Sequence, residues 1–167
     1  SVELILTASP LAPCTDVDQD TMLLSFDPLP IADAGVDDTV CVNQTLTLSG
    51  QRTSSNTSTW STLGDGTFDD ASLLAAIYTP GSNDILAGNV DVILTADAIF
   101  PCTDADSDTM NLVFDPLPIA DAGIDDTICV NQTFTLSGLR TNSDVSLWTT
   151  LGDGSFDDAT SLVPIYT

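Results

Sequence analysis

The stretch Phe26-Asp27-Pro28-Leu29-Pro30-Ile31-Ala32-Asp33-Ala34-Gly35 occurs twice in this chain, because residues 114–123 repeat it letter for letter. Two prolines within three residues exclude a helix and indicate a stiff joint. The similarity extends outward from this joint in both directions. When residues 2–79 are aligned without gaps to residues 90–167, 54 of the 78 positions are identical. The chain is therefore interpreted as part of an array with an 88-residue period, which suits a small independent domain.

This period predicts the domain boundaries. Residues 31–118 form one complete unit, residues 1–30 are the last strands of a preceding unit, and residues 119–167 are the first strands of a following unit. The simpler interpretation is that the sequence is a piece of a longer repeat array, cut within the same loop at both ends. The alternative is that residues 1–30 of one chain complete residues 119–167 of another by strand addition, which would build a filament.

The charge of the chain restricts its partners. There are 25 acidic residues and two arginines, with no lysine or histidine, and the formal net charge is −23. Phosphates would be repelled, so we expect neither nucleic acid nor an anionic membrane surface as a partner. No apolar run approaches the length of a membrane span, so direct membrane insertion is not expected either. The hydrophobic content of 43% nevertheless supports a packed core.

The local pattern predicts an all-β fold. Helix signals are nearly absent, whereas short runs with alternating apolar residues are frequent. Seven strands in a unit of 88 residues are typical of an Ig-like antiparallel β-sandwich, with Trp60 in its core. In the complete unit the expected strands are residues 39–42, 45–48, 58–63, 67–68, 76–79, 90–96 and 109–114.

The motifs resemble those of PKD-like Ig domains. They comprise Ala32-Asp33-Ala34-Gly35-x-Asp37, Trp60 with Gly64-Asp65-Gly66, Tyr78-Thr79-Pro80 and Pro101-Cys102. The whole chain is similar to the tandem repeats of giant Bacteroidota surface proteins exported by the type IX secretion system, including SprB-like gliding adhesins. The resemblance implies an extracellular location on the cell surface, and a structural role in adhesion or gliding motility. The expected partners are neighbouring repeats of the same chain or filament, and surface glycans.

Acidic residues at alternate positions are candidates for calcium binding, because Ca²⁺ prefers six to eight oxygen ligands. A second group flanks the joint, where a metal would stiffen the array. Without metal, the first group would be a solvated acidic loop, and proline and packing would suffice at the joint. The candidates are Asp16, Asp18, Asp20, Asp104, Asp106 and Asp108 in the first group, and Asp27, Asp33, Asp115 and Asp121 in the second. Asp65 is interpreted instead as a turn residue, with Gly64 and Gly66 supplying positive φ angles.

The four cysteines are predicted to form disulfides in an oxidising compartment. The favoured bond joins Cys41 to Cys102 within the complete unit, and Cys14 and Cys129 would then pair with neighbouring repeats. A simple sandwich puts Cys41 and Cys102 at opposite ends, so a bond between neighbouring repeats is the alternative. The resemblance also implies O-glycosylation of Asp-Thr-apolar triplets, at Thr21, Thr39, Thr109 and Thr127.

Catalysis has little support, because histidine and lysine are absent and scattered carboxylates do not make an acid–base pair. We therefore expect no enzyme activity and no cofactor other than Ca²⁺. Two alternative functions are a carbohydrate-binding module and a spacer attached to a secreted enzyme. Trp60, Phe68 and Tyr78 would serve the first alternative if they were exposed, although core positions are expected for them.

Overall fold

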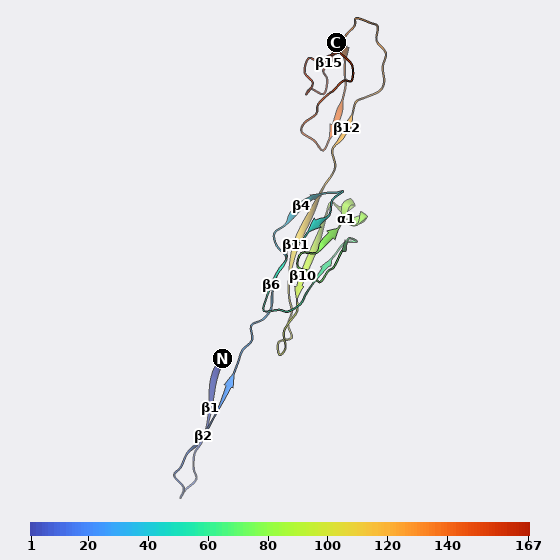
Figure 1. Ribbon diagram of the computed structural model, residues 1–167. Helices are drawn as coiled ribbons and strands as arrows, with labels where there is room; N and C mark the ends of the chain where they lie inside the picture. The colour runs from blue at the N-terminus through green and yellow to red at the C-terminus, as the bar shows by residue number, and fades with distance from the viewer.

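Three parts follow one another along an elongated molecule (Figure 1), and the computed structural model describes all of residues 1–167. A hairpin stands at the N-terminal end, a complete sandwich lies in the middle, and a smaller part follows at the C-terminal end. The predicted all-β fold class is confirmed, since the chain contains strands and one short helix. The apolar core is a single cluster whose members all lie between Ala32 and Phe114.

The middle sandwich has two layers. One is a four-stranded sheet in the order β4-β11-β10-β7, and the other consists of two small sheets, β3-β6 and β5-β9-β8. The seven predicted strands are all present, and β3 and β6 are two further strands that the sequence pattern did not indicate. The elements are β3 (Ile31–Asp33), β4 (Asp38–Cys41), β5 (Leu46–Thr47), β6 (Gln51–Thr53), β7 (Ser58–Thr62), β8 (Thr67–Phe68), β9 (Ile77–Thr79), α1 (Ser82–Ala87), β10 (Asn89–Ala96) and β11 (Asp106–Asp115).

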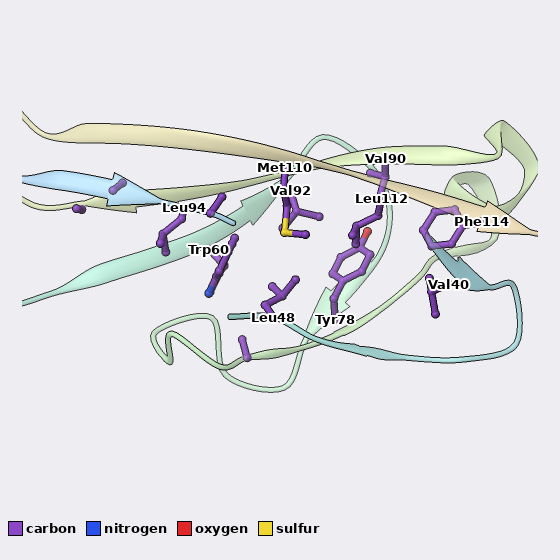
Figure 2. Packing of buried hydrophobic residues seen from close by; sticks show 14 residues of the cluster. Val40, Leu48, Trp60, Tyr78, Val90, Val92, Leu94, Met110, Leu112 and Phe114 are labelled. Atoms are coloured by element: carbon purple, nitrogen blue, oxygen red, sulfur yellow. The ribbon is translucent and has the colours of Figure 1, made fainter. Parts of the chain in front are cut away.

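The alternation of side chains along β10 and β11 builds the core (Figure 2). Successive residues of a strand point to opposite faces, so every second residue faces the other layer. The inward residues of the two strands are all buried, as predicted, and they pack against Trp60, Leu48 and Tyr78. They are Val90, Val92, Leu94, Ala96, Met110, Leu112 and Phe114.

The expectation of a purely antiparallel sandwich is wrong at one edge, where β4 pairs with β11 in parallel. The chain enters through β3, which belongs to the other layer, and then changes layers before β4. Gly35 makes this change possible with a φ of +91°, a conformation that glycine adopts without steric cost. The Asp33 carboxylate accepts a hydrogen bond from the Gly35 N–H at 2.9 Å and fixes the bend.

The helix α1 was not predicted. It has only six residues, which is too short to show a helical period in the sequence. Its end signal is nevertheless present, because Gly88 has a φ of +82° and its N–H caps the last turn. No helix of the structure has the length and apolar character needed to cross a bilayer.

The two flanking parts contain fewer strands than the middle sandwich. The N-terminal part is one antiparallel hairpin, and the C-terminal part has two separate pairs, β12-β14 and β13-β15. Their bounds are β1 (Val2–Ala8), β2 (Asp18–Leu24), β12 (Ile119–Asp121), β13 (Phe134–Thr135), β14 (Leu139–Thr141) and β15 (Ile165–Tyr166).

Candidate assembly interface

The N-terminal hairpin exposes an apolar face that the middle sandwich buries. The β1-β2 pair has the register of β10-β11, since Val2 lies opposite Leu24 just as Val90 lies opposite Leu112. Leu6 is 76% exposed although its counterpart Leu94 is fully buried. The inward-type residues of the hairpin are all exposed, and they are Val2, Leu4, Leu6, Met22, Leu24 and Phe26. We call this set the hairpin face.

The C-terminal part has the complementary defect. A cavity of about 180 Å³ opens beside Trp148 and is lined by Gly138, Ala120 and Leu162, among others. In the middle sandwich, a Cβ atom added to Gly50 would meet both Trp60 and a Leu94 methyl group. At the equivalent Gly138 it would meet Trp148, and the next nearest atoms are the carbonyl oxygens of Asp121 and Leu162 in place of a leucine methyl group. The cavity therefore lies where a leucine equivalent to Leu94 would pack, and we call it the Trp148 groove.

The strands that the flanking parts lack show the same complementarity. Residues 126–129 correspond to β4 and residues 146–150 correspond to β7, yet neither segment forms a strand. In the middle sandwich β4 pairs with β11 and β7 pairs with β10. The counterparts of β10 and β11 are β1 and β2, which lie in the N-terminal part. The C-terminal segments equivalent to β4 and β7 thus have no partner strands beside them, whereas β1 and β2 pair with each other.

Two of the predicted calcium ligands have a definite structural role in the middle sandwich. Asp106 and Asp108 lie in β11, not in a solvated loop, and each carboxylate accepts a backbone N–H from the entering chain. The Asp106 Oδ2 accepts from Ala32 N at 2.8 Å, and the Asp108 Oδ2 accepts from Ala34 N at 2.8 Å. These bonds attach β3 to the edge of the other layer. Asp18 and Asp20 are their counterparts on the hairpin, and both are exposed.

The remaining predicted ligands are dispersed over the surface. Asp33 and Asp121 each accept the N–H of the glycine two residues later, at 2.9 and 2.8 Å. The others are exposed side chains, namely Asp16, Asp27, Asp104 and Asp115. The structure contains no group of three or more His, Cys, Asp or Glu side chains placed to hold a metal ion. Calcium binding stays a prediction.

The two glycines of the Gly64-Asp65-Gly66 turn are needed for a different physical reason from the expected one. Neither Gly64 nor Gly66 has a positive φ. Both are required because other groups approach closely: a Cβ on Gly64 would collide with the Asp84 carboxylate, and one on Gly66 would collide with the Tyr78 hydroxyl. The turn is thus shaped by a buried polar network around Asp84.

Asp84 is a structural residue that the sequence analysis missed. Its Oδ2 accepts hydrogen bonds from the Tyr78 hydroxyl at 2.6 Å and from Gly81 N at 3.0 Å, and its Oδ1 accepts from Asp65 N at 3.0 Å. Burial opposes the charge of Asp84, but these bonds lower the pKa of its carboxyl below the usual value. The sequence does contain a signal for this helix. Pro80-Gly81 precedes it, Asp84 is its third residue, and Gly88 ends it.

The cysteines are all free thiols in the structure, and Cys41 and Cys102 cannot bond within one unit. Cys41 lies opposite Asp115, the last residue of β11, whereas Cys102 precedes the first residue of that strand. The ten residues of β11 span roughly 30 Å, and a disulfide requires Cα atoms closer than about 7 Å. The predicted disulfide between Cys41 and Cys102 is therefore wrong, and a disulfide between neighbouring repeats remains as the alternative.

The four threonines in Asp-Thr-apolar triplets are accessible. Thr21, Thr39, Thr109 and Thr127 are all exposed, so each hydroxyl could receive a sugar without unfolding the chain. Their modification stays a prediction.

Comparison with protein-family models and with curated proteins finds no match for this chain.

Proposed function

We propose that this chain is a structural segment of an extracellular bacterial surface adhesin or filament, in which Ig-like units stand in a row. In this proposal it acts as a stalk or spacer that serves cell adhesion or gliding motility, with neighbouring repeats and surface glycans as partners and Ca²⁺ as a stiffening ion. Within this row, β1 and β2 have the place that β10 and β11 have in the middle sandwich, and a neighbouring unit covers the hairpin face.

The single observation that carries the proposal is that the flanking parts repeat the middle sandwich. The hairpin face repeats, residue for residue, a surface that is buried in the middle sandwich, and β1 and β2 have the register of β10 and β11. Burying a large apolar side chain is worth roughly 1.5–3 kcal/mol, so a neighbouring unit that covers this face stabilises the row.

The alternative of a carbohydrate-binding module has less support. Trp60 and Tyr78 are buried, and Phe68 packs against Tyr78 with ring centroids 5.1 Å apart. None of the three forms an open platform on which a sugar ring could stack. An enzyme spacer would use the same rigid units, and only the sequence beyond these residues distinguishes it from an adhesin stalk.

The proposal is tested by small-angle X-ray scattering and negative-stain electron microscopy of chains that contain increasing numbers of the 88-residue repeat. We expect a rod whose length rises in proportion to the number of repeats. Particles whose longest dimension does not rise with the number of repeats would contradict the role of a stalk.

A further inference from the structure

The loop between β10 and β11 contacts the joint through which the chain enters the middle sandwich. Figure 1 shows this loop at the end of the sandwich that faces the N-terminal hairpin. The thiol of Cys102 lies 3.8 Å from the carbonyl oxygen of Asp27, the residue before the first proline of the joint. A turn closed by the bond from Cys102 N to Ile99 O, at 2.9 Å, holds the backbone there. Cys102 is thus fixed against the end of the preceding unit.

Cys41 lies beside the equivalent carbonyl of its own unit. It is the strand partner of Asp115, and the next residue, Val42, donates its N–H to the Asp115 carbonyl at 3.0 Å. Asp115 and Asp27 are 88 residues apart and occupy the same position in the repeat. At this carbonyl of the repeat, the structure therefore shows the edge-strand cysteine of the same unit at one junction, and the loop cysteine of the next unit at the other.

The 88-residue period brings these two cysteines together at every junction of the row. The sulfur of the loop cysteine lies 3.8 Å from the shared oxygen, and the nitrogen that follows the edge-strand cysteine lies 3.0 Å from the same atom. Two residues placed around one oxygen in this way are within reach of the Cα separation, below about 7 Å, that a disulfide requires. Cys41 is exposed and Cys102 is half-buried, so neither thiol is enclosed in the core.

We propose that consecutive repeats are joined by a disulfide from the edge-strand cysteine of one repeat, equivalent to Cys41, to the loop cysteine of the next repeat, equivalent to Cys102. This inference rests on the proposed function, in which the repeat continues along one chain. Cys129 and Cys14 are the same two cysteines in the flanking repeats. Each repeat then gives one thiol to the junction before it and one to the junction after it.

The chemistry is thiol–disulfide exchange with a low-molecular-weight or protein disulfide as oxidant. The thiolate of one cysteine attacks the oxidant and forms a mixed disulfide, with release of the first half of the oxidant as a thiolate. The thiolate of the second cysteine then attacks the first cysteine and displaces the other half. The two cysteines lose two protons and two electrons in total, and the oxidant is reduced to two thiols.

The consequence is mechanical, because the bond bypasses part of each repeat. In the oxidised row the shortest covalent path through a repeat runs between Cys41 and Cys102, which are 61 residues apart in a period of 88. A pulling force can therefore extend a repeat to roughly 200–220 Å when the row is oxidised, and to roughly 290–320 Å when it is reduced. The joint also gains a second connection, which limits bending between neighbouring units.

The experiment uses chains that contain two, three or four copies of residues 31–118 in tandem, oxidised in a glutathione buffer. These residues contain the whole apolar core, so each copy is a folding unit. Free thiols are counted under denaturing conditions in the monomer fraction from size exclusion. We expect two free thiols per chain whatever the number of repeats, because only the first loop cysteine and the last edge-strand cysteine have no neighbour. A count that rises with every repeat, or a count of zero, would overturn the proposal.

One substitution placed in either repeat of the two-repeat chain gives a matched comparison. Cys41→Ser in the first repeat removes the bond and should leave three free thiols. Cys41→Ser in the second repeat keeps the bond and should leave one. The substituted side chain is exposed and identical in the two variants, so a difference in folding does not explain a difference in count. Equal counts, or the reverse order, would overturn the pairing.

The failure of this inference is distinguishable from the failure of the proposed function. If the rods lengthen with the number of repeats while all thiols stay free, the disulfide is refuted and the stalk stands. If two thiols stay free while the particles do not lengthen, the disulfide stands and the stalk is refuted.

Discussion

The hydroxyl of Tyr78 donates a 2.6 Å hydrogen bond to the carboxylate of Asp84, and both side chains are buried between the Gly-Asp-Gly turn and α1. The bond joins a core aromatic residue to the segment that leads into β10. It ties the short helix to the sandwich, and it explains why the glycines of the turn tolerate no side chain.

Replacing Asp84 with Asn should destabilise the middle sandwich by about 1.5–3 kcal/mol, the range for hydrogen bonds to a charged group. An amide nitrogen cannot accept from Asp65 N or Gly81 N, so at least one buried donor loses its partner. Urea unfolding followed by circular dichroism measures the change. Ser82→Ala, on the exposed side of the same helix, is the control and should stay within about 0.5 kcal/mol.

Alkaline pH should weaken the same network. Burial, together with the bond to Asp84, raises the pKa of Tyr78 from 10.0 to about 12. The folded unit therefore holds the proton more tightly than the unfolded chain does. The stabilisation that comes from the protonated Tyr78 hydroxyl is complete below pH 10 and should be lost as pH rises from about 10 to 12. Unfolding midpoints across this range should fall, and the fall should be smaller for Tyr78→Phe.

Acidic pH should also destabilise the folded unit, because the pKa of the Asp84 carboxyl is lowered in the folded state. The stabilisation is present above the ordinary value of 3.8 and is lost as pH falls below it. Urea midpoints between pH 5 and pH 2 measure the loss. Asp84→Asn should show a shallower fall than the wild type, and an equal slope in the two proteins would contradict this assignment.

Removing Asp106 or Asp108 should loosen the entry of the chain into the sandwich. Asp108→Ala leaves the N–H of the buried residue Ala34 without its acceptor, which costs about 1–3 kcal/mol. Asp104→Ala is the matched control from the same acidic run and should change stability by less than about 0.5 kcal/mol. Equal losses for the two variants would assign the run a shared role, such as metal binding, in place of this one.

Calcium binding, expected from the acidic groups, should appear as a melting temperature that falls on addition of EGTA. A ligand that binds only the folded state stabilises it in proportion to the logarithm of its concentration. One kcal/mol moves the melting temperature of a domain of this size by about 4–8 °C. A change below about 2 °C would contradict calcium binding to the folded chain.

The sequence determined much of the middle sandwich because the relevant signals are local. Alternation along 90–96 and 109–114 identified the buried face of β10 and β11, and Trp60 was placed in the core correctly. The repeat also identified the hairpin as a copy of buried strands, which is the basis of the assembly interface. These features depend on side-chain period and identity, which can be read along the chain.

Other features needed residues far apart in the sequence to be placed side by side. The parallel edge joins Cys41 to Asp115, and Asp108 reaches Ala34 across 74 residues. No pattern within either segment encodes these partners. Asp106 and Asp108, two of the acids predicted to bind calcium, accept hydrogen bonds from backbone N–H groups that the sequence places 74 residues away.

The sequence alone therefore determined the period, the strand content and the inward faces, since these follow from the two-residue alternation of a strand. Only the tertiary structure decided how the ends of the units meet. It placed Cys41 and Cys102 at opposite ends of β11, because ten extended residues lie between their surroundings.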